Sequence, residues 1–303
     1  MCSSDLLKDP SALFLVNLAE NASVIVAPES AETSRTKPVG TGPYILDRWL
    51  PGDSVSLTKN PRYRGADTVS MERVTFKFIG DGDAQVAALL AGDVDFFPNI
   101  SAVEATAQFQ KDARFQVLVG STEGETILAI NNKRGPLADL RIRQALSYAI
   151  NRDEIILGAM SGLATPIGSH FAPHNPAYVD LTKTYVTDQA RARGLIADAG
   201  LANGFELTIT VPPVDYARRS AQIIQAQLAR VGVTSRIIEV EWARWLDEVY
   251  TRKNYDLTIV SHVEPWDITV YGNPDYYFQY DSPAMREILA RANRTTDVAG
   301  QNK

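Results

Sequence analysis

The order of apolar and polar positions along the chain predicts an α/β protein. In the second half, short apolar runs alternate with segments whose apolar residues recur every three or four positions. Residues 205–211 are predicted to form a strand, and residues 216–231 follow as a long amphipathic helix, whose inward residues are Ile223, Ile224, Gln227, Leu228 and Val231. Strands that alternate with helices favour a sheet with helices packed against it.

The first half is richer in strand patterns. Residues 44–49 and 54–58 are separated by a Pro-Gly-Asp turn, and residues 74–79 alternate with period two. A helix is predicted over 84–91, ending at Gly92. Other predicted strands are 24–26, 94–97, 115–119, 126–130, 235–240 and 256–263; other predicted helices are 103–110, 139–150, 153–160, 188–200, 244–252 and one starting at Ser282.

The change of pattern near residues 125–133 predicts two lobes. A strand-like run enters Asn131-Asn132 and is followed by Gly135-Pro136. Strands dominate before this point, and strands and helices alternate after it. We therefore expect a first lobe over residues 1–128 and a second lobe over residues 129–303.

Composition narrows the possible functions. The chain has 303 residues, 45% hydrophobic and 22% charged, with a net charge of −6. A mildly acidic chain without a basic run is not expected to bind nucleic acid or anionic membrane surfaces. Residues 1–5 have neither the basic nor the apolar part of a signal peptide. The single cysteine, Cys2, excludes an internal disulfide, and we do not expect it to carry a lipid because only Met1 precedes it.

Motifs typical of enzymes and cofactors are incomplete. His170 and His174 have a metal-binding spacing, but Pro173 predicts a loop and no acidic residue nearby in sequence completes a site. The glycines around Ser161 have the wrong offsets for a nucleophile elbow, and Gly40-Thr41-Gly42 is followed by proline rather than a helix. We therefore expect no catalysis, no cofactor and no bound metal.

A cluster of acidic and aromatic residues follows the predicted strand 256–263. The candidate ligand-binding residues there are His262, Glu264, Trp266, Asp267 and Tyr271. Six aromatic residues occur between positions 266 and 280, in a chain that is 9% aromatic. Ligands of α/β proteins bind beyond the carboxyl ends of strands, where carboxylates can pair with a cation and aromatic rings can cover it. The alternative is a tyrosine-rich loop that packs on its own lobe.

Two tryptophans lie between a predicted strand and the next helix. Of Trp242 and Trp245, we expect one in the core and the other facing a cleft, and Trp245 is a candidate ligand contact.

Several blocks of the sequence, in order, resemble one family. They are Pro38-Val39-Gly40-Thr41-Gly42-Pro43-Tyr44, Asn60-Pro61-Arg62-Tyr63-Arg64-Gly65, residues 87–95, and residues 131–152. Together they resemble the family 5 extracellular solute-binding proteins of bacterial ABC importers, the dipeptide, oligopeptide and nickel group. The resemblance covers nearly all of residues 11–299.

The resemblance implies a two-lobed fold of the type II periplasmic binding proteins. It implies a monomer in the periplasm that binds a small-molecule or peptide ligand between its lobes and delivers it to an ABC permease, without catalysis. In relatives an acidic residue after a second-lobe strand holds the ligand's α-ammonium, which corresponds here to Glu264 or Asp267. Asn131 lies near the lobe crossover in relatives and is a weaker candidate. A solute-sensing regulatory module with the same fold is an alternative, and an enzyme is a more distant one.

The resemblance also implies that the chain is an internal fragment with an incomplete first lobe. Complete members carry a long segment before the Gly-Thr-Gly-Pro-Tyr block, which here starts near residue 40, and a segment after the second lobe that returns to the first.

We predict that the 303-residue chain binds ligand weakly by itself, because a site with one incomplete wall cannot bury most of a ligand. Calorimetry with a mixed dipeptide library measures this directly. Tight binding would contradict the prediction.

Overall fold

The chain forms two compact units. The computed structural model describes residues 7–20, 23–264, 266–295, 297 and 300. Unit A is Phe14–Thr106, and unit B is Met1–Leu13 together with Ala107–Lys303. Cys2 lies outside the described residues, so the structure says nothing of its chemistry.

This division differs from the lobe boundary drawn between residues 128 and 129, which falls within strand β4 (Glu125–Ile130). β4 pairs along its whole length with β7 (Leu257–His262). Because these hydrogen bonds join β4 to the later part of the chain, its two halves lie in one unit.

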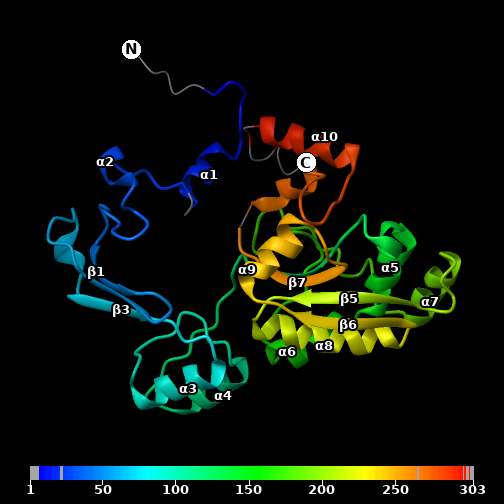
Figure 1. Cartoon of the computed structure of the whole chain (residues 1–303), viewed down its shortest axis with the longest axis horizontal. Coiled ribbons are helices and arrows are strands. Elements are labelled where there is room, and N and C mark those ends of the chain that lie inside the picture. The colour runs from blue at the N-terminus through cyan, green and yellow to red at the C-terminus, as the bar shows by residue number, and fades with distance from the viewer. Residues whose placement is uncertain (1–6, 21–22, 265, 296, 298–299, 301–303) are drawn as a thin grey trace. The chain divides into compact units, whose positions relative to one another are not determined.

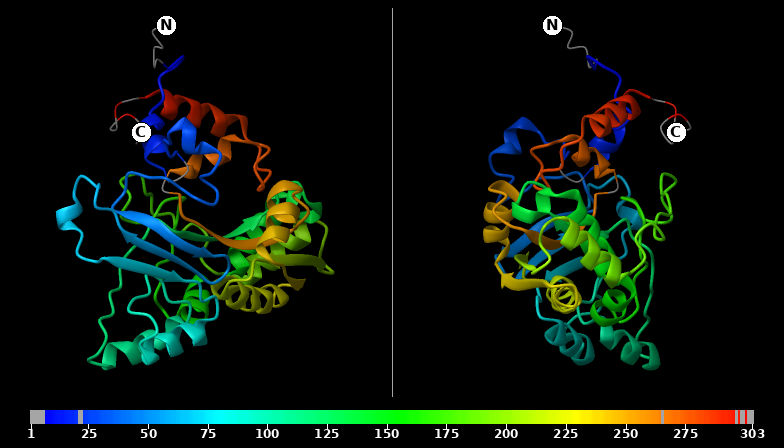
Figure 2. Two further views of the ribbon diagram at one scale, coloured as in Figure 1. Left: turned by 60° about the vertical axis from the view of Figure 1, so that its left-hand side comes forward. Right: turned by 90° about the vertical axis from the view of Figure 1, so that its right-hand side faces the viewer.

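Unit A contains an antiparallel sheet in the order β1-β2-β3, drawn in blue to cyan in Figure 2. The strands are β1 (Tyr44–Leu50), β2 (Ser54–Lys59) and β3 (Arg73–Lys77). The turn between β1 and β2 contains Gly52 at φ 77°, a conformation that favours glycine. Helical segments of this unit are α1 (Phe14–Ala19), α2 (Pro28–Ala31), η1 (Ala66–Thr68), α3 (Gly82–Ala91) and η2 (Val103–Ala105), and α4 (Thr106–Lys111) begins at its last residue.

Buried Asn60 joins two of the sequence blocks described above. Its side-chain amide donates to the carbonyl of Gly42 at 2.9 Å, and its backbone N–H donates to the carbonyl of Pro43 at 2.9 Å. Its Oδ1 accepts the N–H of Arg62 at 3.0 Å. The Gly-Thr-Gly-Pro-Tyr turn and the Asn-Pro-Arg-Tyr turn therefore form one hydrogen-bonded structure at the ends of β1 and β2.

Unit B is built on a four-stranded sheet in the order β4-β7-β5-β6. β5 (Phe205–Val211) runs parallel to β6 (Val233–Glu239) and to β7, whereas β4 is antiparallel to β7. Arrows for β7, β5 and β6 lie side by side in Figure 1. The carboxyl ends of these three parallel strands meet at one edge of the sheet, which is where α/β proteins place their ligands.

Helices pack against this sheet. α8 (Asp215–Ala229) packs against β5, β6 and β7, and α6 (Arg152–Met160) packs beside α8, as the right-hand view of Figure 2 shows. Within the described ranges, no helix has the length and apolar character needed to cross a membrane. The remaining helical segments of unit B are η3 (Gly135–Ala138), α5 (Leu140–Ala149), α7 (Gln189–Asp198), α9 (Trp242–Trp245), a π-helical turn η4 (Leu246–Thr251), η5 (Asp267–Gly272) and α10 (Pro283–Arg294).

β7 contributes side chains to two buried clusters. Leu257 and Ile259 belong to a cluster shared with β5 and α8. Val260 belongs to a second cluster with Trp245 and Tyr277. Both faces of β7 are therefore covered, as is typical of a strand in a parallel sheet, and even its polar residue Thr258 is fully buried.

Most predicted elements of unit B are confirmed. Three predicted strands, two in unit A and one in unit B, are wrong. Residues 205–211 form β5 as predicted, and Ser282 caps α10 by accepting the N–H of Met285 at 3.3 Å. Residues 24–26, 94–97 and 115–119 are irregular. Among the described residues they pair with no strand, so their backbone lacks the cross-strand hydrogen bonds that a β conformation needs.

We predict that replacing Gln227 by leucine destabilises the protein. Gln227 is 1% exposed; its Oε1 accepts the N–H of Asn151 at 3.1 Å, and its Nε2 donates to the carbonyl of Asn151 at 3.2 Å. The variant removes these bonds and the one from Nε2 to Glu154 Oε2 at 3.0 Å. The carbonyl of Asn151 still accepts the N–H of Ile155, so the main loss is the partner of the Asn151 N–H, which costs about 1–3 kcal/mol. Denaturant unfolding measures the change, with Gln222→Leu on the exposed face of the same helix as control. Equal stability of the two variants would contradict it.

Candidate functional site

The candidate site lies at the carboxyl end of β7. His262 is the last residue of β7, and the chain then enters η5, which begins with Asp267. His262 is 8% exposed and pairs across the sheet with Glu125, the first residue of β4. The β4–β7 register therefore places a histidine and a carboxylate opposite each other at this edge.

Asp267 is held between two histidines. Its Oδ1 lies 2.5 Å from His170 Nε2, and its Oδ2 lies 2.7 Å from His262 Nδ1. An ionised carboxylate only accepts hydrogen bonds, so both ring nitrogens donate to it. His262 Nε2 lies 2.7 Å from the hydroxyl of Tyr277, which can donate to it and fix the ring.

The histidine contacts keep Asp267 ionised. Burial alone raises the pKa of Asp267, but the hydrogen bonds from His170 and His262 outweigh burial and hold this pKa well below its usual range. Asp267 is therefore a fixed negative charge whose two oxygens are oriented by ring N–H groups.

Glu125 is a second carboxyl group in a different environment. It is 7% exposed, and its Oε2 has no hydrogen-bond partner among the described residues. His170 Nδ1 lies 3.5 Å from this Oε2. Burial is the main cause that raises the pKa of Glu125 to about 7.

Aromatic rings surround these groups. Tyr271 meets the ring of His170 edge-on at 5.0 Å between centroids, and Trp266 meets Phe171 at 5.7 Å. Burial, together with the charges of Asp267 and Glu125, raises the pKa of Tyr271 to about 12, so its hydroxyl stays protonated at neutral pH. The site thus combines negative charge with aromatic surfaces.

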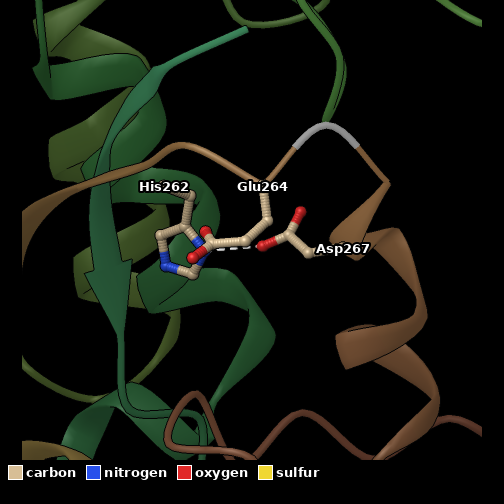
Figure 3. Close-up of side chains that lie close together, drawn as sticks. All are labelled: His262, Glu264 and Asp267. Atoms are coloured by element: carbon tan, nitrogen blue, oxygen red, sulfur yellow. Dashed lines mark hydrogen bonds and ion pairs between the residues drawn. The ribbon is translucent and has the colours of Figure 1, made fainter. Parts of the chain in front are cut away.

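Glu264 is the exposed carboxylate of the site. Figure 3 shows the side chains of His262, Glu264 and Asp267 directed toward one another. One Glu264 oxygen, Oε2, accepts the N–H of Val263 at 3.1 Å. Because Glu264 is exposed and Asp267 already accepts two ring N–H groups, Glu264 is the carboxylate more available to a ligand from solvent.

The same three residues are the group that comes closest to a metal site in the described part of the chain, with donor atoms within 4.8 Å of one another. However, His262 Nδ1 and Asp267 Oδ2 are hydrogen bonded to each other, so this nitrogen carries a proton. The arrangement is complete as a hydrogen-bonded network, and we do not assign metal ligands to it.

Two candidate ligand-binding residues, Trp245 and Asn131, are instead buried and hydrogen bonded within the fold. Trp245 is 4% exposed, and its indole N–H donates to Thr258 Oγ1 at 2.9 Å. Trp242 is the exposed member of the pair, so the structure corrects the expectation that Trp245 is the ring available to a ligand. The Asn131 amide donates to the carbonyls of Lys253 and Tyr255 at 3.0 and 3.1 Å, and these bonds hold the end of β4.

Two histidines have acidic partners that the sequence did not reveal. We predicted that His170 and His174 lack acidic neighbours, and this was wrong. His170 contacts Asp267, and His174 Nε2 lies 2.6 Å from Glu123 Oε1. Asp267 and Glu123 are far from these histidines in the sequence. The one local signal for acidic groups at this site was the position of Glu123 and Glu125 just before the predicted strand 126–130.

Comparisons with known proteins agree with this fold. The sequence matches the family described as "Bacterial extracellular solute-binding proteins, family 5 Middle" over residues 6–285. The glutathione-binding protein GsiB of Escherichia coli (strain K12) is 26% identical over 319 residues, covering 98% of this chain and 62% of that protein. GsiB of Shigella dysenteriae serotype 1 (strain Sd197) is 29% identical, covering 97% of this chain and 61% of that protein. The chain thus spans less than two thirds of the length of these relatives.

Solved structures show the same fold. The periplasmic binding protein DppA from Helicobacter pylori, in complex with the peptide STSA, has a TM-score of 0.88 at 23% identity, covering 97% of this chain and 61% of that one. A dipeptide-binding protein from Pseudoalteromonas sp. SM9913, in complex with Met-Leu, has a TM-score of 0.87 at 22% identity, covering 97% and 62%. The predicted α/β fold of the type II periplasmic binding proteins is confirmed.

We predict that Asp267→Asn destabilises the protein at pH 7 by about 1–3 kcal/mol. An asparagine oxygen can accept from one histidine, but its NH₂ group then faces the N–H of the other. Because the pKa of Asp267 is depressed, its contribution is fully present at pH 7 and is lost only as pH falls through the folded-state value. Thermal unfolding at pH 7 measures the effect, with the exposed Asp275→Asn as control. A variant as stable as the control would show that the two histidine contacts contribute nothing.

Proposed function

Because the chain belongs to the bacterial extracellular solute-binding proteins, family 5, we propose that it binds a short peptide for an ABC importer. In this role a protein captures its ligand, presents it to a permease and releases it unchanged. The chain covers 62% of the length of the E. coli glutathione-binding relative, so transport by a whole protein is a proposal for this chain.

The observation that carries the proposal is the pairing of a half-buried ionised carboxylate with an exposed one. Asp267 is fixed by two histidines, and Glu264 lies beside it at the surface. Two carboxylates at one point favour a ligand group with a positive charge. The α-ammonium of a peptide has this charge and donates hydrogen bonds that Glu264 can accept.

Aromatic rings supply the second half of the recognition. Trp266 and Tyr271 lie on either side of Asp267 in the sequence, and both are partly exposed. Such rings can cover apolar parts of a ligand and attract a cation to their faces. The proposed binding residues are therefore Glu264, Asp267, Trp266, Tyr271 and His262, with Asp267 and His262 as the inner layer.

The ligands of relatives agree with a peptide that has a free amino end. They are glutathione for GsiB, the peptide STSA for DppA and Met-Leu for the dipeptide-binding protein. All three contain an α-ammonium group at neutral pH. None of these relatives is named as a sensor, so we do not carry the regulatory alternative further.

The setting of the protein is part of the proposal. We propose the periplasm as its compartment, a membrane permease as its partner, and a monomer as its working form. The net charge of −6 supports the expectation that nucleic acid is not a partner.

We predict that Glu264→Gln weakens binding of Met-Leu by roughly tenfold, the effect of losing one hydrogen bond to a charged group. Titration of the ¹⁵N-labelled chain with Met-Leu and with glutathione, followed by NMR shifts, detects even weak binding. N-acetyl-Met-Leu, which lacks the ammonium, should bind the wild type and the variant equally weakly.

Glu206→Gln is the matched control, because Glu206 is exposed near the start of β5, at the opposite end of the sheet. If Glu264→Gln binds Met-Leu as the control does, Glu264 is not the ammonium partner. If neither peptide shifts any signal, the peptide proposal is wrong.

A further inference from the structure

Glu125 is a buried acid to which the proposed function gives no task. It is 7% exposed, its Oε2 has no hydrogen-bond partner among the described residues, and it sits opposite His262 in the β4–β7 register. A buried polar atom normally finds a partner, so an unpaired carboxyl oxygen beside a ligand site needs a physical reason.

The hydrogen bonds of His170 supply that reason. Asp267 only accepts, so His170 Nε2 uses its proton on Asp267 Oδ1. In a ring that carries this one proton, Nδ1 is an acceptor, and it faces Glu125 Oε2 at 3.5 Å. An ionised Glu125 would then place two acceptors face to face. One proton on the Glu125 carboxyl group, donated to His170 Nδ1, satisfies both atoms.

We propose that Glu125 and His170 share one exchangeable proton, and that this proton leaves to solvent when a positively charged ligand group occupies the space beside Glu264 and Asp267. Glu125 and His170 thereby make ligand capture depend on pH. The second part of the proposal rests on the proposed function, and the first part does not.

The charged groups around Glu125 act in both directions: His170 and His262 lower its pKa, whereas Asp267 and Glu123 raise it. His170 faces it from the loop between α6 and α7, His262 from β7, and Asp267 and Tyr271 from η5; Glu123 precedes it in the sequence. Asp267 stays ionised, and its charge opposes ionisation of Glu125. A cation bound beside Asp267 reverses that balance and favours loss of the Glu125 proton.

The pKa of Glu125, raised to about 7 mainly by burial, sets the pH range. Below pH 7 most sites hold the proton, and a cationic ligand must displace it. Above pH 7 the site is already ionised, so affinity should rise with pH and then level off. Between pH 6 and pH 8 the rise should be up to about tenfold, since the competent fraction changes by that factor.

The shared proton is tested in the free protein. NMR of the full chain labelled with ¹³C-glutamate should show one carboxyl group that titrates near pH 7, against about 4.3 for ordinary glutamates. This signal should be absent from Glu125→Gln and present in Glu123→Gln. If no glutamate of the wild type titrates above about pH 6, the proposal is wrong, whether or not the variant folds.

Release of the proton is tested by calorimetry with Met-Leu at pH 7 in phosphate and Tris, two buffers of different ionisation enthalpy. The wild type and Glu123→Gln should release roughly half a proton per bound peptide, and Glu125→Gln none. Equal release by Glu125→Gln and the wild type would overturn this step. If Met-Leu and glutathione do not bind at all, peptide binding and its proton release both fail, while the NMR titration still decides the shared proton.

Discussion

The carboxylate of Asp267 between two imidazole rings is the interaction on which the site depends. It joins three segments that are far apart in the sequence: the end of β7 through His262, the start of η5 through Asp267 itself, and the loop that carries His170. A buried charge costs several kcal/mol unless hydrogen bonds compensate it, and here each oxygen has a ring N–H donor. The conformation of the loops at the carboxyl end of β7 therefore depends on the charge state of Asp267.

That arrangement depends in turn on the sheet. β7 is covered on both faces by apolar clusters, so its position and register are fixed by packing. Fixed register places His262 at the last position of the strand and Glu125 opposite it. A one-residue slip of β4 would move Glu125 to the other face of the sheet and leave His170 without the carboxyl group it now faces. The positions of the two acids thus follow from hydrophobic packing far from either of them.

Much of this fold could be predicted from sequence because its signals are local. β5 was predicted to the residue, since a short segment that alternates apolar and polar residues between Gly204 and Pro212 has few other interpretations. His262, Glu264 and Asp267 were found because they lie within one short stretch after a strand. Glu125 and His170 were missed because their contacts arise from strand pairing and from the path of a long loop, and neither leaves a local pattern. Trp245 was placed at the ligand for a similar reason: sequence showed two neighbouring tryptophans but not which one faces Thr258.

The three carboxyl groups of the site divide its chemistry by depth. Glu264 is exposed and can exchange a solvent contact for a ligand at small cost. Asp267 is permanently charged because two ring donors compensate its burial. Glu125 lies deepest, with an unpaired oxygen, and its burial is relieved only by a proton. The site therefore has one negative charge at the surface on Glu264 and a second below it on Asp267. Glu125 can supply a third when it loses its proton. Such a gradient attracts a cation without requiring three like charges to remain close together when the site is empty, which their mutual repulsion would oppose.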